Sequence, residues 1–197
     1  MAPKVPVHRN ITAIPLPELF PTIFCSIIAA AWLEAINGRI HNQPDSRYTI
    51  PEDHWFAGSL LLDFTNPEAV DWWFEKRKYL LTLGVDGFKT DGGEFILSDD
   101  VVAANGCTGL EMRNGYAASY IKAYSRFVGK DRVLFSRAGY KGQQKYPIQW
   151  AGDQMSTWEE FHHILSAGLS IGLSGVPFWR VAIRLLLYID YWMKLEL

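Results

Sequence analysis

The sequence predicts an α/β fold built around a parallel sheet, and three observations support this prediction. Short apolar runs, as expected of buried parallel strands, recur along the chain from residue 48 onward. Segments with apolar residues at helical spacing alternate with these runs. The connections between them are short, so strand and helix follow each other in the order typical of parallel α/β proteins.

The N-terminal residues 1–47 do not follow this pattern. Six prolines interrupt them, and only 24–36 has helical potential. The apolar stretch over 21–33 is too short to span a bilayer and lies too far along the chain for a signal peptide. Because Cys25 and Cys107 form no disulfide framework, we expect reduced thiols and favour a cytoplasmic location.

The first predicted unit is a strand over 59–64 followed by a helix over 66–83. The strand sequence SLLLDF is short and mostly apolar, as expected of a buried parallel strand. Asn66 supplies an N-cap, and Pro67 follows at the first helical position. Gly84 is expected to end this helix.

The second predicted unit begins with a strand over 85–90, which ends in the acidic, glycine-rich turn DGGE at 91–94. A helix follows in which aromatic residues recur at near-helical spacing. These residues are Tyr116, Tyr120, Tyr124 and Phe127.

Three more strands and one more helix complete the predicted order. We expect strands over 132–136 and 147–151, a helix from a capping box at 156–159 to about 167, and a strand over 169–178.

Composition limits the classes of function. The chain has 197 residues, of which 49% are hydrophobic and 20% charged, so one domain with a buried core is the default expectation. A net charge of −2 argues against a nucleic-acid partner, and no segment argues for a membrane. Aromatic residues make up 14% and include eight tryptophans, a content often found where sugars bind. Packing of these rings explains the same content, and composition alone favours that explanation.

Two acidic residues fall at the ends of predicted strands, where parallel barrels place their catalytic groups. Asp91 follows the strand over 85–90, and Asp153 follows the strand over 147–151. Each has a neighbouring glycine, which lets backbone and ligand approach closely. A pair of carboxylates is the minimum set for glycoside hydrolysis. Turn or N-cap aspartates give the same pattern, and spacing alone favours that structural role.

Three other patterns suggest different chemistry, and each has a simpler explanation. Residues 168–172 match the G-x-S-x-G nucleophile motif, but that motif needs a strand before the serine and a helix is predicted there. His162 and His163 are adjacent on a predicted helix, so they do not share one metal-binding face. Four acids without EF-hand spacing are explained as a solvated loop. These are Asp91, Glu94, Asp99 and Asp100.

Four blocks of sequence, in the same order, resemble glycoside hydrolase family 31. The run VDGFKTDGGE at 85–94 closely resembles the nucleophile motif of this family of retaining α-glycosidases. In a second block, SRAGY at 136–140 and WAGDQ at 150–154 resemble its arginine and acid/base motifs, with similar spacing. DFTNP at 63–67 and GLSGVPFW at 172–179 resemble the flanking strands.

The resemblance implies part of a (β/α)8 barrel and a role for each matched residue. Asp91 would be the nucleophile that forms an ester with the sugar, and Asp153 would be the acid and base. Arg137 would bind sugar hydroxyls, Lys89 would point into the same pocket, and Trp150 would stack on the sugar or form the pocket wall. The implied partner is an α-linked oligosaccharide or glycoside, and no cofactor or metal ion is implied.

The resemblance also divides the chain and leaves three functions open. Residues 1–47 match poorly, 48–179 match the barrel, and 180–197 diverge from the family. A complete barrel has about 250 residues, and the likeness to the family ends abruptly after Trp179. We therefore expect a truncated or frame-shifted reading, or a gene fragment. The expected function is a retaining α-glycoside hydrolase, similar to α-glucosidases and α-xylosidases. The alternatives are an inactive fragment of such an enzyme and a transglycosylase or lyase of the same family.

Overall fold

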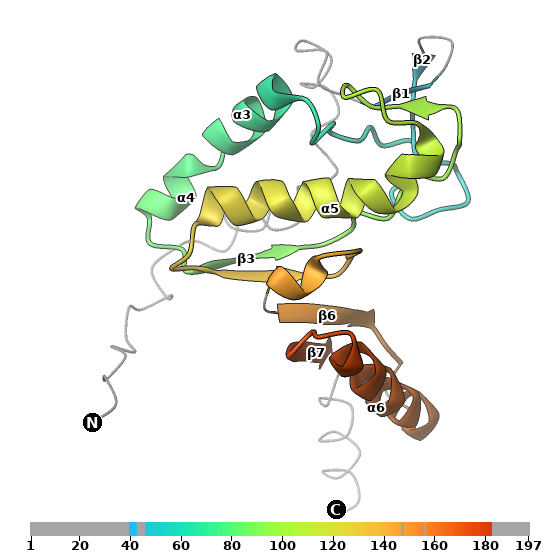
Figure 1. Cartoon of the computed structure of the whole chain (residues 1–197), viewed down its shortest axis with the longest axis vertical. Helices are drawn as coiled ribbons and strands as arrows, with labels where there is room; N and C mark the ends of the chain where they lie inside the picture. Colours follow the sequence, from blue (N-terminus) through green and yellow to red (C-terminus); the bar gives the residue numbers. More distant parts are fainter. Residues whose placement is uncertain (1–39, 43–45, 147, 156, 183–197) are drawn as a thin grey trace, which may run out of the picture.

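The computed structural model describes residues 40–42, 46–146, 148–155 and 157–182 (Figure 1). Its main sheet has four parallel strands in the order β3-β5-β6-β7. These strands are β3 (Gly87–Thr90), β5 (Val133–Ser136), β6 (Ile148–Asp153) and β7 (Phe178–Ala182). The predicted parallel α/β fold is therefore confirmed, and the strands predicted over 85–90, 132–136 and 147–151 correspond to β3, β5 and β6.

A second, antiparallel sheet has the order β2-β1-β4. It consists of β1 (His41–Asn42), β2 (Ser46–Arg47) and β4 (Val101–Val102). Because β1 pairs with β4, the segment that follows β3 is joined to residues that precede β3 by about 45 positions.

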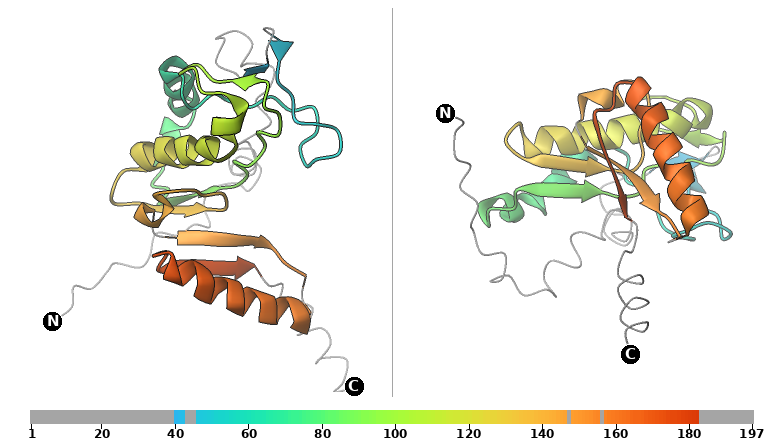
Figure 2. Two further views of the ribbon diagram at one scale, coloured as in Figure 1. Left: turned by 45° about the vertical axis from the view of Figure 1, so that its right-hand side comes forward. Right: turned by 90° about the horizontal axis from the view of Figure 1, so that it is seen from below.

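Four α-helices lie in the described part of the chain. They are α3 (Pro67–Glu75), α4 (Lys78–Thr82), α5 (Gly109–Val128) and α6 (Trp158–Leu173), and a short 3₁₀ helix, η3 (Gln143–Lys145), lies between β5 and β6. Helix α5 lies along β3, and α6 lies along β7 (Figures 1 and 2). None of the described helices is long and apolar enough to cross a bilayer. The apolar stretch over 21–33 falls outside the described residues.

The first helix begins as predicted but ends early. The Oδ1 of Asn66 accepts hydrogen bonds from the backbone N–H groups two and three residues on, at 3.0 and 3.4 Å, which confirms the N-cap. The prediction of a single helix over 66–83 is wrong, because the segment forms two helices, α3 and α4. At the break, Nη1 of Arg77 donates to the carbonyl of Trp73 at 2.8 Å and takes the place of the next helical N–H. Gly84, with φ of 86°, follows α4 as expected.

The strand predicted over 59–64 is not part of the main sheet. Leu60 forms only an isolated bridge with Thr49, and the carbonyl of Leu61 accepts a hydrogen bond from Ile40 at 3.1 Å. Leu60 to Phe64 are nevertheless all buried. The apolar sequence over 59–64 therefore indicated burial correctly. It did not indicate a sheet strand, because an extended segment can be buried without pairing with neighbouring strands.

The prediction of a strand over 169–178 is also wrong. Residues 169–173 belong to α6, and β7 begins only at Phe178. The helix starts at the N-cap Thr157, whose side chain accepts from the N–H of Glu160 at 3.2 Å. Ser156, where the capping box was predicted, lies outside the described residues. Apolar residues near the end of an amphipathic helix therefore imitated a short buried strand.

The core lies between α5 and the segments that surround it. The buried tyrosines of α5 pack against Phe64, whose ring centroid lies 4.9 Å from that of Tyr120. Their hydroxyl groups are also paired: Tyr116 donates to the carbonyl of Leu62 at 3.0 Å, and Tyr124 accepts from Nε1 of Trp73 at 3.0 Å. Burial raises the pKa of Tyr116. Each such ring contributes about 1.5–3 kcal/mol through burial, so α5 is held firmly against α3 and the buried segment over 60–64.

The two helices α5 and α6 cover the same face of the main sheet. Phe88 contacts the rings of Tyr124 and Phe127 on α5. Trp179 lies against α6, where a Cβ on Gly168 would come within 2.0 Å of its ring. Strand register places these two residues on one face, because Thr90, Ser136, Gln149 and Trp179 stand side by side. Lys89, Phe135 and Trp150 alternate with these residues along their strands and face the opposite side of the sheet.

Candidate active site

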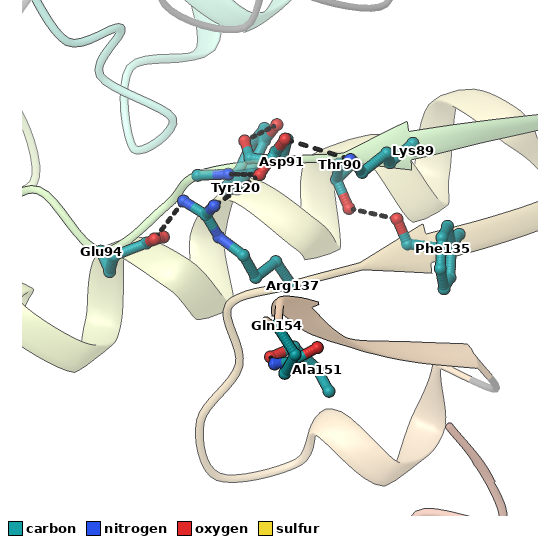
Figure 3. Close-up of polar contacts among 10 residues, drawn as sticks. Lys89, Thr90, Asp91, Glu94, Tyr120, Phe135, Arg137, Ala151 and Gln154 are labelled. Atoms are coloured by element: carbon teal, nitrogen blue, oxygen red, sulfur yellow. Dashed lines mark hydrogen bonds and ion pairs between the residues drawn. The ribbon is translucent and has the colours of Figure 1, made fainter. Parts of the chain in front are cut away.

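The site lies at the carboxyl end of β3, on the face opposite to the one that α5 and α6 cover. Asp91 is the first residue after the strand, and three groups contact its carboxylate (Figure 3). Nζ of Lys89 lies 3.2 Å from Oδ2, and Nη1 of Arg137 lies 3.0 Å from Oδ1. The N–H of Gly92 donates to Oδ1 at 2.9 Å. Two cations and one N–H donor therefore stabilise a negative charge at this position.

Arg137 joins two carboxylates from one strand end. It follows β5 directly, and its backbone N–H donates to the carbonyl of Thr90 at 3.1 Å. While Nη1 contacts Asp91, Nη2 pairs with Glu94, as Figure 3 shows. The Glu94 side chain is 46% exposed. The partial loss of solvent around its carboxyl raises the pKa of Glu94, and the neighbouring Arg137 opposes this rise. The planar guanidinium thus fixes the turn that carries Asp91.

Lys89 and Trp150 form the floor of the site. Lys89 lies two residues before Asp91, so both side chains project from the same face of β3. Its Nζ lies 3.3 Å from the centroid of the Trp150 ring, in cation–π contact. Trp150 is buried, and Cζ of Arg137 lies 5.7 Å from the same ring. The Trp150 ring therefore lies within cation–π distance of both Lys89 and Arg137.

Asp153 is the last residue of β6, and an irregularity in that strand sets its direction. Trp150 pairs with Arg180 and Asp153 with Ala182, so three steps along β6 oppose two along β7. The extra residue falls next to Gly152, whose φ is 99°. Without it, side chains three residues apart would face opposite sides of the sheet. With it, Asp153 shares the face of Trp150, on which Lys89 and Asp91 also lie.

The Asp153 side chain is exposed. Among the described residues, no ion pair or hydrogen bond holds its carboxylate. At the next residue, Nε2 of Gln154 donates to the carbonyl of Ala151 at 2.6 Å and closes the turn after β6 (Figure 3). The two aspartates thus differ sharply: Asp91 is fixed between cations, whereas Asp153 is open to solvent and to an incoming ligand.

Helix α5 supports the site from behind. The hydroxyl of Tyr120 donates to the backbone carbonyl of Asp91 at 3.0 Å. Gly93 adopts φ of 100°, and a Cβ there would lie 3.0 Å from the Tyr120 ring and 3.1 Å from Ala138. Thr90 and Ser136 join β3 to β5 through a 2.6 Å hydrogen bond between hydroxyls. The helical spacing of the tyrosines predicted α5, but no sequence signal linked Tyr120 to Asp91.

One residue near the site belongs to no predicted motif. The ring centroid of Trp55 lies 6.0 Å from Cζ of Arg137, and its side chain is 63% exposed. The high tryptophan content was the only sequence signal for it. Trp55 lies in a loop before the first predicted strand, where no pattern singles it out.

The competing patterns do not form sites. The G-x-S-x-G match at 168–172 lies inside α6, so no strand precedes its serine. Of the four acids, Asp99 pairs with Arg113 at 2.8 Å, while Asp91 and Glu94 contact Arg137. In the part of the chain that the structure describes, no three His, Cys, Asp or Glu side chains are placed to hold a metal ion.

Comparison with known proteins gives consistent matches to carbohydrate-active enzymes. An isomaltosyltransferase from Sporosarcina globispora is 46% identical over 153 residues, which cover 76% of this chain and 14% of that protein. A 1,3-α-isomaltosidase from Kribbella flavida is 44% identical over 129 residues, which cover 64% of this chain and 18% of that protein. The chain thus spans less than a fifth of the length of these two relatives.

Solved structures match in the same region. A cycloalternan-forming enzyme from Listeria monocytogenes, in complex with a pentasaccharide substrate, has a TM-score of 0.73 at 42% identity. The match covers 77% of this chain and 15% of that one. A cycloalternan-degrading enzyme from Trueperella pyogenes, in complex with isomaltose, has a TM-score of 0.71 at 35% identity, over 77% of this chain and 22% of that one.

The family comparison covers all of the described residues. Residues 31–183 match the TIM-barrel domain of glycosyl hydrolases family 31. The predicted partial (β/α)8 barrel is thereby confirmed, and the four parallel strands with their helices are part of that barrel. The division at residues 47 and 179 stays a prediction. The match over more than half of the chain shows that this chain belongs to glycosyl hydrolase family 31.

Proposed function

We propose that this chain carries the catalytic carboxylates of a retaining α-glycosidase, with Asp91 as the nucleophile and Asp153 as the acid and base. The observation that carries the proposal is the environment of Asp91. A carboxylate at a strand end that pairs with both Lys89 and Arg137 is placed to attack a sugar bound there. Family membership supports the reaction class.

The reaction proceeds in two displacements. Oδ of Asp91 bonds to the anomeric carbon while Asp153 gives its proton to the glycosidic oxygen, and the bond from that carbon to the leaving oxygen breaks. Water then attacks the glycosyl ester, Asp153 takes the water proton, and the Asp91 carboxylate is released. Retention requires the two carboxyl groups to lie about 5–5.5 Å apart in the working site.

The remaining residues would bind and orient the sugar. Arg137 has fixed donors beside Asp91, so its guanidinium is placed for contact with a sugar hydroxyl. Lys89 is held between Asp91 and the Trp150 ring and presents its ammonium to the same space. Trp150 is buried beneath Lys89, which favours a role as pocket wall over stacking on the sugar.

The substrate we propose is an α-linked glucose oligosaccharide, and isomaltose is the first probe. Relatives at 44% and 35% identity are a 1,3-α-isomaltosidase and an enzyme solved in complex with isomaltose. A transferase is the second candidate, because the isomaltosyltransferase is 46% identical. In a transferase, a sugar hydroxyl replaces water in the second displacement, and the same two aspartates act.

Covalent labelling of the full chain tests the proposal. We expect a fluorinated α-glucosyl fluoride to add one glycosyl group to Asp91, detected by mass spectrometry of peptides. Asp91→Ala should abolish the label. Asp131→Ala is the matched control, because Asp131 is an exposed acid that precedes β5 at the opposite end of the sheet.

Three results separate the candidate functions. A label on another residue would contradict the nucleophile assignment. A folded chain that takes no label and releases no product from an aryl α-glucoside would point to the inactive alternative. Products that are larger than the substrate would identify transfer, whereas glucose alone would identify hydrolysis.

A further inference from the structure

A cavity of about 590 Å³ lies between α3 and α5. Pockets for small molecules have volumes of about 300–1,000 Å³, so this cavity is large enough for a ligand. The two helices lie side by side (Figure 1), joined by the hydrogen bond from Trp73 to Tyr124 and by the rings of Phe74 and Phe127, which stack 4.5 Å apart. No residue that lines the cavity belongs to the candidate site, so both places can be occupied at the same time.

Each helix contributes one of its faces to the cavity. Asp71 and Phe74 are three residues apart on α3, and both line it. On α5, Ser119, Lys122 and Arg126 follow each other at intervals of three and four residues. Residues at this spacing share one face of a helix. Charged and hydroxyl side chains from one helix therefore meet an acid and an aromatic ring from the other.

A buried acid that the proposed mechanism does not use fixes one end of this cavity. Asp63 is 1% exposed, and its carboxylate accepts hydrogen bonds from the hydroxyl of Thr65 and from the N–H of Ala104, both at 2.6 Å. The N–H of Asn105 in turn donates to Oγ1 of Thr65 at 3.3 Å. Both Thr65 and Asn105 line the cavity. This wall is thus in place before a ligand arrives, which lowers the entropy cost of binding.

The polar groups of the cavity include both donors and acceptors of hydrogen bonds. Among the described residues, Asp71, Lys122 and Arg126 form no ion pair with one another or with other side chains. Lysine and arginine only donate, an ionised aspartate only accepts, and the hydroxyl of Ser119 does both. Oδ1 of Asn105 accepts from the N–H of the residue two positions on at 3.0 Å, which leaves Nδ2 of its amide as the donor for a ligand.

This set of groups fits a neutral ligand better than an anion. Asp71 would repel a negative charge that Lys122 and Arg126 attract. The start of α3 offers an anion little, because Oδ1 of Asn66 already accepts from two of its first N–H groups. A sugar hydroxyl, in contrast, donates and accepts at once, so it can use the cations and the acid together.

We propose that the cavity between α3 and α5 is a second binding site, which takes a neutral sugar of one or two rings. The half-buried rings of Phe74 and Phe127 would contact the C–H groups of the sugar, and the polar side chains would bind its hydroxyls. The inference goes beyond the proposed function, because this site contains neither of the two aspartates and catalyses no reaction. It would hold a carbohydrate on the chain while the candidate active site stays open.

NMR titration of the full chain with isomaltose tests the second site. We expect the side-chain NH₂ signals of Asn105, assigned by their loss in Asn105→Asp, to shift until they saturate. The backbone N–H of Gly92, which contacts Asp91, reports separately on the candidate active site. Both signals are measured in the unaltered chain, so this test does not depend on the folding of a binding-site variant.

Replacement of Arg126 tests the contribution of the polar wall. We expect the dissociation constant read from Asn105 to rise about tenfold in Arg126→Ala, which corresponds to about 1.4 kcal/mol. Arg113→Ala is the matched control, because it removes an exposed arginine from the same helix that lies outside the cavity and pairs with Asp99. The control should change this constant less than twofold, and equal constants in the two variants would contradict the site.

A parallel titration with inorganic phosphate tests the chemical class of the ligand. Phosphate should leave the Asn105 signals unchanged at concentrations where isomaltose saturates them. If phosphate shifts these signals and isomaltose does not, the cavity binds anions and the inference is wrong. If isomaltose shifts the Gly92 signal alone and Asp91 takes the covalent label, the second site is excluded and the proposed function stands. If isomaltose shifts the Asn105 signals but Asp91 takes no label, the second site stands and the proposed function fails.

Discussion

Arg137 holds Asp91 in place across the boundary between two strands: its Nη1 lies 3.0 Å from Oδ1 of the aspartate. Arg137 follows β5 and Asp91 follows β3, and these strands pair in register up to Thr90 and Ser136. Parallel pairing therefore places Arg137 beside Asp91, at the same end of two neighbouring strands. The contact depends on strand register as much as on charge.

Replacement of Arg137 by lysine should keep the charge and lose the fork that reaches Asp91 and Glu94. Charge-assisted hydrogen bonds contribute about 1.5–3 kcal/mol, so we expect glycosylation of Asp91 to slow by about 10- to 100-fold. Arg113→Lys alters an exposed pair with Asp99 and should change the rate less than twofold. Equal rates in the two variants would show that the fork of Arg137 is dispensable.

The pH dependence of stability should report on Glu94. Burial raises its pKa above the ordinary 4.5, so the folded state holds this proton more tightly than the unfolded state. The chain therefore loses stability relative to Glu94→Gln as the pH rises from about 4.5 through the raised pKa. Melting temperatures of both proteins between pH 4 and 7 measure this difference.

Glu111 provides a control of opposite sign. Hydrogen bonds from the backbone and the hydroxyl of Thr108 lower the pKa of Glu111. The unaltered chain should therefore gain stability relative to Glu111→Gln as the pH rises, and lose it as the pH falls through the lowered pKa. Parallel trends for the two glutamates would contradict the assignment of burial as the cause at Glu94.

Two glycines of α6 should respond to alanine in opposite directions. A Cβ on Gly168 would meet the Trp179 ring, so Gly168→Ala should push the helix from β7 and destabilise the chain by about 1–3 kcal/mol. At Gly172 nothing lies within 4 Å, so alanine should stabilise the helix by about 0.5–1 kcal/mol. Urea unfolding measures both, and destabilisation of equal size would place the cause in the helix backbone.

Gly93 should also resist replacement. Its positive φ and the nearness of Tyr120 both oppose a side chain, so we expect Gly93→Ala to cost about 1–3 kcal/mol. Gly106 has φ of 85° with nothing within 4 Å, so Gly106→Ala isolates the backbone cost of about 1 kcal/mol. Calorimetry compares the two, and identical losses would show that crowding beside Tyr120 contributes nothing.

Local signals predicted several elements well. The Asn66 cap and the strands that became β3, β5 and β6 were readable because caps and apolar runs act over a few residues. The segment after Gly168 was misassigned as a strand. In the structure, exposed Leu165, Leu169 and Leu173 recur every four residues along α6, and this helical spacing was the signal to follow.

The candidate site was predictable in its members but not in its contacts. Sequence blocks placed Asp91, Arg137 and Asp153 after strands, where side chains of a parallel sheet converge. The pairing of Arg137 with Glu94 and the contact of Lys89 with Trp150 depend on the register between strands, which one sequence does not specify. Trp55 reaches the site from a loop, where spacing carries no information.

The irregular step in β6 decides which face of the sheet carries the Asp153 side chain. Its side depends on whether an odd or an even number of residues separates it from the regular part of the strand. Deletion of Gly152 would therefore turn the carboxylate toward the helices while leaving its identity and charge unchanged. In β6, the number of residues before Asp153 therefore decides whether its carboxylate faces the candidate site or the helices.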